Sequence, residues 1–311
     1  GNSRIERMRC SSMSDSGNRF LEQETPTWST TNPIQSIRRA RCTRLFYTLL
    51  SFDYIHIAIR CVRYYSPAMK WIGNTDKKSE MLSLGCWTFG GSQWGGQNDD
   101  DSRDAMQKAY ESGLTHFDTA SGYGGGHSEQ IVGDFISDKR DHIFLASKQG
   151  AQAEKEKYTA AIDASLKRLG TDYIDLYYIH WPNSKFDLRP TMEALVEAKS
   201  AGKIKAIGVS NFSIEQMDQV REVGQIDANQ LCYNLLWRWD EADIIPYCIE
   251  HKVSVVSYSS IAQGILTGKF SEHPQFREGD QRPQTTLFAD DVWPSVFTGV
   301  ERMKIIAADA K

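Results

Sequence analysis

The chain has 311 residues, of which 40% are hydrophobic and 24% charged, and its formal net charge is −4. This composition is typical of a globular protein with one large domain or two small ones. The mildly acidic balance gives no electrostatic reason to expect nucleic acid or an anionic membrane as a partner. The six cysteines, at positions 10, 42, 61, 86, 232 and 248, show neither CxxC nor zinc-site spacing. We therefore predict no disulfide framework, no metal site and a reducing, cytoplasmic location.

The first 68 residues differ in charge from the rest. They contain ten arginines, no lysine and five acidic residues, a net charge of +5 within a chain whose total is −4. The apolar run 45–59 contains Asp53 and His56 and is shorter than the roughly 20 apolar residues that a spanning helix needs. We predict no membrane anchor. Residues 1–68 are expected to be an Arg-rich extension, disordered or not native to the folded unit, which covers residues 69–311.

Beyond residue 80, strand-like apolar runs alternate with amphipathic helical segments. Strands are predicted at 81–86, 114–118, 143–147, 174–179, 204–209, 228–231 and 253–258. Helices are predicted at 100–113, 128–138, 155–169, 190–201, 213–223 and 241–251. Gly113, Gly170, Gly202 and Gly224 stand at expected helix ends, and Ser213 with Gln216 forms a predicted capping box. Repeated strand–helix units indicate a parallel sheet with helical crossovers.

Ionisable side chains stand at the carboxyl ends of three of these strands: Asp118 is the last residue of one, Lys148 and His180 directly follow two others, and Tyr123 lies just beyond the first. A closed barrel of the (β/α)8 type builds its active sites at the carboxyl ends of its strands, so these residues favour that α/β fold. An open dinucleotide-binding sheet would place G-x-G-x-x-G after its first strand. The segment 87–91 is instead WTFGG. The four groups together suggest a proton-donating site, whereas each alone is an ordinary polar residue at a strand end.

Several motifs, in order, make the chain resemble the aldo-keto reductase family from about residue 71 to residue 311. They are LGCWTFGG at 84–91, FDTA at 117–120 with YG at 123–124 and SE at 128–129, SLKRL at 165–169, DYIDL at 172–176, HWP at 180–182, GKI at 202–204, GVSNF at 208–212, YS at 258–259 and AQG at 262–264. The resemblance implies a (β/α)8 barrel that binds a nicotinamide cofactor without a Rossmann domain. The family pattern favours NADPH and leaves NADH open.

The resemblance also implies a catalytic tetrad of Asp118, Tyr123, Lys148 and His180. The residue types suit the reduction of a carbonyl, which needs a hydride on carbon and a proton on oxygen. A tyrosine has an ordinary pKa near 10, and a neighbouring lysine cation is expected to lower it. Asp118 would hold the lysine charged, and His180 would donate a hydrogen bond to the carbonyl oxygen.

Cofactor-binding residues follow from the same resemblance. Ser210, Asn211 and Gln230 would bind the nicotinamide carboxamide, and Tyr258 would stack on the ring. The next loop would approach the pyrophosphate through its backbone; it contains Ser259, Ser260, Ala262, Gln263 and Gly264, with Ser260 where the family often has proline. Lys269 either contacts a cofactor phosphate or is a solvated surface lysine. Trp87, Trp181 and Trp237 stand where the family lines its substrate pocket, although packing is the alternative role for each.

The resemblance weakens toward Lys311. Seven strands are predicted, and the helical pattern at 296–310 is the one that precedes an eighth strand in the family. We therefore expect a C-terminally truncated barrel that lacks the eighth strand and the segment that holds the adenosine 2′-phosphate; the alternative is a replacement strand from residues 54–63. The segment 270–295 carries no recognisable chemical motif.

The sequence thus predicts an oxidoreductase that reduces an aldehyde or ketone with a nicotinamide cofactor, with Tyr123 as the general acid. A small carbonyl compound is the expected partner, without nucleic acid, metal or membrane. Two alternatives stay open: a non-catalytic regulatory subunit resembling the potassium-channel β-subunits, and an inactive fragment.

Overall fold

A parallel sheet of seven strands forms the centre of the molecule. The computed structural model describes residues 70–73, 75–76, 78–91 and 94–309. Neighbouring strands pair in chain order: β3 (Leu84–Gly85), β4 (His116–Asp118), β5 (Phe144–Gln149), β6 (Ile174–Ile179), β7 (Ile204–Ser210), β8 (Ala228–Cys232) and β9 (Ser254–Tyr258). The predictions for residues 1–68, including the proposed strand at 54–63, lie outside the described residues.

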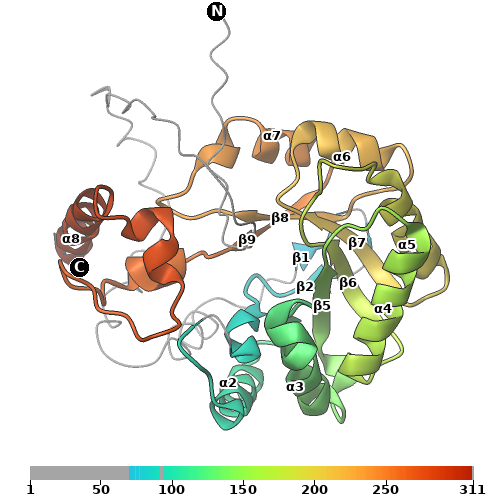
Figure 1. The fold of residues 1–311 in the computed structure, drawn as a ribbon, viewed down its shortest axis with the longest axis horizontal. Coiled ribbons are helices and arrows are strands. Elements are labelled where there is room, and N and C mark those ends of the chain that lie inside the picture. The colour runs from blue at the N-terminus through green and yellow to red at the C-terminus, as the bar shows by residue number, and fades with distance from the viewer. Residues whose placement is uncertain (1–69, 74, 77, 92–93, 310–311) are drawn as a thin grey trace, which may run out of the picture.

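Helices connect successive strands and cover the outside of the sheet (Figure 1). They are α2 (Asp99–Glu111), α3 (His127–Ile136), α4 (Lys155–Leu169), α5 (Arg189–Ser200), α6 (Ile214–Arg221) and α7 (Ile244–Glu250). This is the nearly closed barrel of the (β/α)8 type that the strand and helix pattern predicts. Within the described residues no eighth parallel strand joins the sheet.

The helix ends follow local chemistry. The Ser213 hydroxyl accepts from the Gln216 backbone N–H while the Gln216 side chain accepts from that of Ser213, so the predicted capping box at the start of α6 is confirmed. Gly170 ends α4 in the left-handed conformation, with φ of 61°, as expected. Gly224 is not such a residue, because α6 ends at Arg221 with Glu222 as its cap.

Packing fills both sides of the sheet. Outward-facing strand residues and the helices form the main apolar core, which includes Phe117, Tyr158 and Tyr177. The barrel interior is a smaller cluster that combines alanines with larger apolar side chains: Ile72, Phe144, Ala146, Leu176, Tyr178, Ala206 and Ala228. Gly208 is required there, since a Cβ at this position would lie 2.2 Å from the Tyr178 ring.

An antiparallel hairpin that the sequence did not reveal covers the amino-terminal end of the barrel. It consists of β1 (Lys70–Trp71) and β2 (Lys78–Ser79). The Gly73 backbone N–H donates to the Ser254 hydroxyl at 2.7 Å, and Ser79 Oγ lies 2.5 Å from His116 Nδ1. Ser254 and His116 are the first residues of β9 and β4, so the hairpin contacts the strands where they begin.

The segment after β9 packs as a separate aromatic cluster against the barrel. It contains η7 (Ala262–Thr267), η8 (Arg282–Gln284), η9 (Thr286–Phe288) and α8 (Trp293–Asp309). Phe270, Phe276, Phe288 and Trp293 pack edge or face against one another, with ring centroids 5.0–6.1 Å apart. Asp280 forms a β-bridge with Trp94 in the loop after β3, which ties this segment to the barrel.

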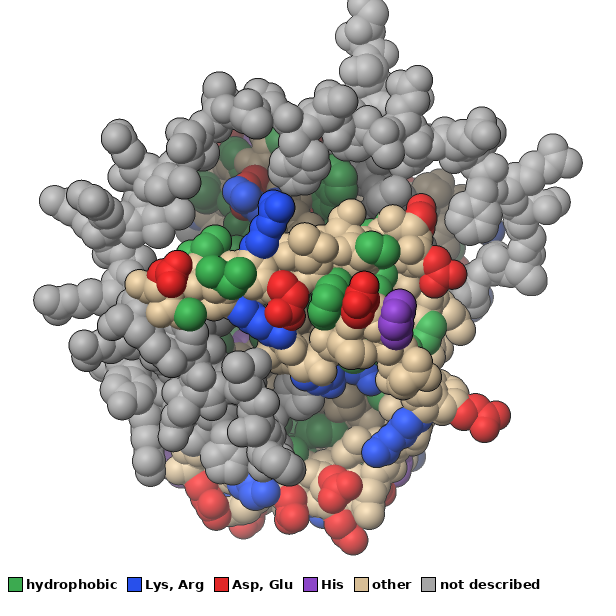
Figure 2. Space-filling model, turned by 90° about the vertical axis from the view of Figure 1, so that its left-hand side faces the viewer, with side chains coloured by type: hydrophobic (Ala, Val, Ile, Leu, Met, Phe, Trp, Pro, Cys, Tyr) green, Lys and Arg blue, Asp and Glu red, His purple; other side chains and the backbone are tan. Residues whose placement is uncertain are grey.

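The α8 side of the molecule carries apolar side chains among charged ones (Figure 2). Ile305 and Ile306 on α8 are 62% and 68% exposed. None of the helices in the described ranges is long and apolar enough to cross a membrane.

Candidate active site

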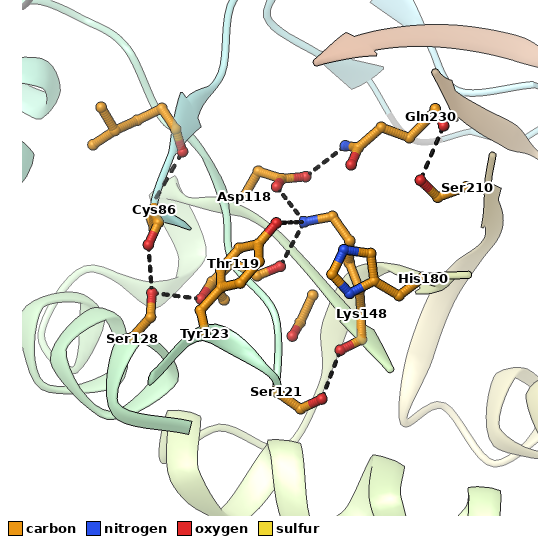
Figure 3. Close-up of polar contacts among 12 residues, drawn as sticks. Cys86, Asp118, Thr119, Ser121, Tyr123, Ser128, Lys148, His180, Ser210 and Gln230 are labelled. Carbon is orange, nitrogen blue, oxygen red and sulfur yellow. Dashed lines mark hydrogen bonds and ion pairs between the residues drawn. The ribbon is translucent and has the colours of Figure 1, made fainter. Parts of the chain in front are cut away.

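Four predicted catalytic side chains converge at the carboxyl ends of β4, β5 and β6 (Figure 3). Asp118 is the last residue of β4, Lys148 lies near the end of β5, and His180 directly follows β6. Tyr123 begins the turn η4 (Tyr123–Gly126), just beyond Asp118. The structure therefore brings together the residues that the strand-end pattern singled out.

Lys148 is the centre of this group. Its side chain is fully buried, and its ammonium donates to Asp118 Oδ1 at 2.5 Å, to the Thr119 carbonyl at 2.8 Å and to the Tyr123 hydroxyl at 3.4 Å. These partners match the three donors of an ammonium group. Burial alone would lower the pKa of Lys148, but the Asp118 carboxylate and Tyr123 outweigh burial and raise that pKa. Lys148 is therefore a permanent cation at neutral pH.

Asp118 links Lys148 to Gln230, one of the residues predicted to bind the cofactor. Its second oxygen, Oδ2, accepts a hydrogen bond of 2.9 Å from the Gln230 amide on β8. A buried carboxylate is costly unless it is paired and hydrogen-bonded, and here both oxygens have a donor. This arrangement fixes Lys148 and Gln230 relative to each other.

Tyr123 is held as a neutral phenol. Burial raises its pKa above the ordinary 10, and this effect outweighs the lowering by the Lys148 cation. The Lys148 cation thus lowers the Tyr123 pKa as the sequence predicted, but the net shift is upward because of burial, which cannot be read from the residues alone. A protonated Tyr123 beside a fixed cation can give up its proton when an acceptor with developing negative charge arrives.

His180 stands edge-on to Tyr123, with ring centroids 5.7 Å apart and planes at 79°. Burial and then the Lys148 cation lower the pKa of His180 to about 3. The imidazole is therefore neutral at physiological pH and has one N–H to donate.

Close packing of glycines fixes the turn that carries Tyr123. Gly124, Gly125 and Gly126 have φ of 59°, 64° and 100°. A Cβ on Gly124 would lie 2.4 Å from the carbonyl oxygen of Gly90, in the turn η3 (Trp87–Gly90). This contact brings η3 against η4, and the Trp87 ring stacks on Tyr123 at a centroid distance of 6.1 Å. Sequence analysis missed the contact, for which the glycine runs at 90–91 and 124–126 were the only signal.

A second group of predicted residues gathers beside the first. Ser210 and Gln230 are buried, and the Ser210 hydroxyl donates to the Gln230 carbonyl at 2.9 Å. The Asn211 amide donates to Ser210 Oγ at 3.0 Å and to the His180 carbonyl at 3.3 Å. The Tyr258 hydroxyl donates to Asn211 Oδ1 at 2.8 Å. Polar groups from the ends of three strands, β7, β8 and β9, thus meet next to His180 and form a donor and acceptor set suited to an amide.

The turn after β9 has an unusual backbone. Ser259, Ala262, Gln263 and Gly264 have φ of 52°, 49°, 53° and 98°, a left-handed conformation that non-glycine residues rarely adopt. Strain of this kind clusters at ligand sites. Ser260 lies in the same turn, and its hydroxyl bonds the Ser257 hydroxyl at 3.0 Å. Lys269 lies farther along, 4.9 Å from the Phe270 ring, and is exposed.

The three predicted pocket tryptophans lie in two different places. The Trp87 ring stacks on Tyr123 and makes a T-shaped contact with Trp94, with ring centroids 5.0 Å apart. Trp181 and Trp237 line a separate cavity together with Asn211 and Tyr258. Trp94 was not predicted from the sequence. Ser128 was noted there only as part of the SE motif; its hydroxyl bonds Thr119 Oγ1 at 2.9 Å and donates to the Cys86 carbonyl at 2.8 Å. In the described part of the chain, no cluster of three or more His, Cys, Asp or Glu side chains could hold a metal ion.

Comparison with known proteins agrees with this geometry. The model of the Aldo/keto reductase family matches residues 81–311. Aldo-keto reductase YhdN of Bacillus subtilis is 38% identical over 247 residues, which cover 76% of this chain and 75% of that protein. The NADH-specific methylglyoxal reductase of Escherichia coli is 33% identical over 262 residues, covering 76% and 80%.

Solved structures show the same fold. The glycerol dehydrogenase AKR11B4 from Gluconobacter oxydans superposes with a TM-score of 0.71 at 32% identity and covers 79% of both chains. An aldo-keto reductase from Klebsiella pneumoniae in complex with NADPH superposes with a TM-score of 0.58 at 31% identity, covering 63% of this chain and 70% of that one.

These relatives are named as reductases or dehydrogenases, so a non-catalytic subunit is not favoured. The chain belongs to the aldo/keto reductase family and is a nicotinamide-dependent oxidoreductase that reduces carbonyl groups.

Proposed function

We propose that this site reduces small aldehydes and ketones to alcohols, with Tyr123 as the general acid. The observation that carries the proposal is the position of Lys148, whose buried ammonium bonds both Asp118 and the Tyr123 hydroxyl. The lysine cation lies next to the oxygen that becomes negative when Tyr123 loses its proton. Such stabilisation by a preorganised charge is a large contribution to catalysis in a site of low dielectric constant.

The other two residues have distinct roles in this proposal. Neutral His180 donates its ring N–H to the substrate carbonyl oxygen and orients it toward Tyr123. Asp118 keeps Lys148 charged and in place. When bound, the nicotinamide cofactor supplies the hydride to the carbonyl carbon. The Tyr123 proton then completes the alcohol, and solvent reprotonates the phenol.

The cofactor fits the second group of residues. Ser210, Asn211 and Gln230 offer hydroxyl and amide groups to a carboxamide, and the Tyr258 ring offers a flat surface. The backbone N–H groups of the strained turn at 259–264 would approach the pyrophosphate. Lys269 would meet a phosphate. We propose NADPH as the cofactor, supported by the Klebsiella complex; the NADH-specific E. coli relative makes NADH the appropriate comparison.

Small carbonyl compounds are the proposed substrates. Methylglyoxal, the compound in the name of the E. coli relative, is the first to test. We also propose a cytoplasmic protein whose barrel unit begins near residue 69.

The test is the variant Tyr123→Phe, assayed with NADPH and with NADH on methylglyoxal. Loss of the acid is expected to lower turnover by about 100- to 10,000-fold, while cofactor affinity in a fluorescence titration stays within about twofold because Tyr123 is not among the proposed cofactor contacts. Turnover equal to that of the unmodified protein would exclude Tyr123 as the acid.

A further inference from the structure

Glu129 is a fully buried carboxylate that takes no part in the proton-transfer steps proposed above. It lies in the first turn of α3, shortly after the turn that carries Tyr123. Its Oε1 accepts from the Ser147 hydroxyl at 2.6 Å, and its Oε2 accepts from Arg168 Nε at 2.6 Å. Both carboxylate oxygens therefore have a donor, and this one side chain joins α3 to β5 and α4.

The bond to Ser147 connects Glu129 with the strand that carries Lys148. Successive side chains of a strand point to opposite faces. Lys148 bonds Asp118 in the catalytic group, so Ser147 faces the helices on the other side of β5. The bond between Glu129 and Ser147 therefore fixes the start of α3 relative to the strand that holds the catalytic cation.

The turn that carries Tyr123 is tied to β5 on both sides. Before the turn, the Ser121 hydroxyl donates to the Lys148 carbonyl at 2.9 Å (Figure 3). After the turn, Glu129 accepts from Ser147. Between these two ties, the Lys148 ammonium lies 3.4 Å from the Tyr123 hydroxyl, which is the longest of its three hydrogen bonds. A small movement of the turn would therefore break this contact.

Arg168 packs against the last residue of the same turn. A Cβ on Gly126 would lie 2.7 Å from Arg168 Cδ and 2.9 Å from its Nε, so the arginine side chain lies directly on the backbone there. Arg168 is itself held by Glu129 and by a bond of 3.3 Å to the Ser165 hydroxyl. The ion pair thus limits the positions that η4 can take.

A similar pair at the opposite rim of the barrel provides a comparison. Arg140 Nη2 lies 2.8 Å from Asp175 Oδ2, and this oxygen also accepts from the Leu145 backbone N–H at 3.0 Å. Asp175 joins two strands near their amino-terminal ends, whereas Glu129 belongs to the helix that follows the Tyr123 turn. A buried ion pair is weak evidence for stability, so the location of the Glu129 pair is the informative difference.

We propose that Glu129, acting through Ser147 and Arg168, is a positioning residue that sets the distance between the Tyr123 hydroxyl and the Lys148 ammonium. The inference rests on the proposed function, because it takes Tyr123 as the general acid. A misplacement of about 1 Å caused far from the chemistry can lower a rate by about 100-fold. Loosening these bonds should therefore slow the chemical step and leave ligand binding unchanged.

The test measures kcat and KM of the full-length protein with NADPH and methylglyoxal. Ser147→Ala leaves Glu129 Oε1 without its donor, so kcat should fall about 10- to 100-fold. KM for methylglyoxal and the affinity for NADPH in a fluorescence titration should stay within about twofold, because the lost interaction acts on the transition state.

Glu129→Gln is the conservative variant. Its amide oxygen can accept from Arg168, while its amide nitrogen donates to the Ser147 hydroxyl, which accepts as well as donates. It should therefore keep at least about one third of kcat, whereas Glu129→Ala should lose about as much as Ser147→Ala. The double variant Glu129→Ala with Ser147→Ala should lose little more than Glu129→Ala alone, since both changes break the same bond.

Asp175→Ala is the matched control. Like Glu129→Ala, it removes the carboxylate of a buried ion pair, so both variants should lower the midpoint of urea unfolding. Asp175→Ala should nevertheless keep kcat within about twofold, because its pair does not contact the Tyr123 turn. If Glu129→Ala does not fold, Ser147→Ala and Glu129→Gln decide the question.

Two outcomes overturn the inference and leave the proposed function intact: Ser147→Ala keeps the kcat of the unmodified protein, or Asp175→Ala loses as much kcat as Glu129→Ala. In the second case the loss follows from stability and not from the position of Tyr123. Full turnover in Tyr123→Phe, or failure of the unmodified protein to reduce methylglyoxal, would count against the proposed function itself.

Discussion

The strands β6 and β9 show how differently the two sides of this barrel are built. Every residue of β6 is buried, whereas no residue of β9 is fully buried and Ser257 is exposed. The catalytic side, from β4 to β6, has its charges paired within the protein before any ligand arrives. The β9 side instead presents a partly exposed strand and a strained turn. Under the proposed function, the β4–β6 side is arranged for proton transfer before the ligand arrives, and the β9 side would be completed by the bound cofactor.

Removing the charge at the centre of the catalytic side should have the largest effect. Lys148→Met leaves Asp118 as a buried carboxylate without its ion-pair partner, which typically costs about 3–5 kcal/mol of stability. It also removes the cation that stabilises the Tyr123 phenolate, so turnover should fall by about 1,000-fold or more. Urea unfolding and carbonyl reduction measure the two effects.

The double variant Asp118→Asn with Lys148→Met is the control for this prediction, because it removes both charges. It should regain most of the lost stability without regaining activity. If the single variant is as stable as the unmodified protein, the catalytic side is not held together by this pair.

The glycine contact between η3 and η4 gives the next largest effect. Gly124→Ala introduces a Cβ 2.4 Å from the Gly90 carbonyl oxygen and should displace Tyr123, lowering turnover by roughly 100-fold. Gly125→Ala is a matched control, since Gly125 also has positive φ but its Cβ would meet nothing within 4 Å. Equal loss of turnover in both variants would show that backbone strain alone, and not this contact, positions Tyr123.

Acid should destabilise the barrel through two buried histidines on the catalytic side. Burial lowers the pKa of His116 to about 4 and that of His180 to about 3, from an ordinary value of 6.5. As pH falls below 6.5, these histidines take up protons in the unfolded chain but not in the folded chain. Their contribution to the free energy of unfolding is therefore complete above pH 6.5 and declines toward pH 4. Urea unfolding at about pH 7.5 and about pH 5 measures the decline.

His116→Gln tests that assignment, because its decline should be smaller than that of the unmodified protein. Carbonyl reduction at the two pH values should differ little on account of His180, which stays neutral at both. A decline of equal size in His116→Gln and the unmodified protein would contradict the role of His116.

The smallest effect is expected on the β9 side. Tyr258→Phe keeps the aromatic ring but removes the hydroxyl that donates to Asn211 Oδ1. The stability lost should be only about 0.5–1.5 kcal/mol, the usual net value of one hydrogen bond. In the variant, the Asn211 side chain can bind the cofactor without first breaking its hydrogen bond to the Tyr258 hydroxyl. The cofactor should therefore bind a few-fold more tightly in a fluorescence titration. Much weaker binding would mean that the hydroxyl itself holds the cofactor.

Periodicity and strand-end chemistry predicted much of the catalytic side. Helix α4 has the bounds that its apolar spacing indicated, and Asp118, Lys148 and His180 meet because parallel strands end at one rim. The first strand was predicted too long, since Met81 and Leu82 are exposed and only Leu84–Gly85 pairs. The local sequence pattern shows that a strand is present, but it does not determine at which residue backbone pairing with the next strand begins.

Features that depend on distant contacts escaped prediction. The hairpin β1–β2 is too short to show periodicity, and the aromatic residues at 270–293 have no regular spacing, although they pack together. The direction of the Tyr123 pKa shift depends on how much water the folded site excludes. No residue type or spacing carries that information.

The hairpin at the base of the barrel also bears on how the chain folds. Its bond from Gly73 to Ser254 joins residues 181 positions apart, and Ser254 donates in turn to the Trp71 carbonyl. Closing so long a loop is entropically costly and slows folding, so the bond that completes docking of the hairpin forms only after β9 has joined the sheet. On a ribosome the hairpin emerges early and stays undocked until most of the chain is made. Its docking is therefore a late step, and substitutions at Gly73 should speed unfolding more than they slow folding.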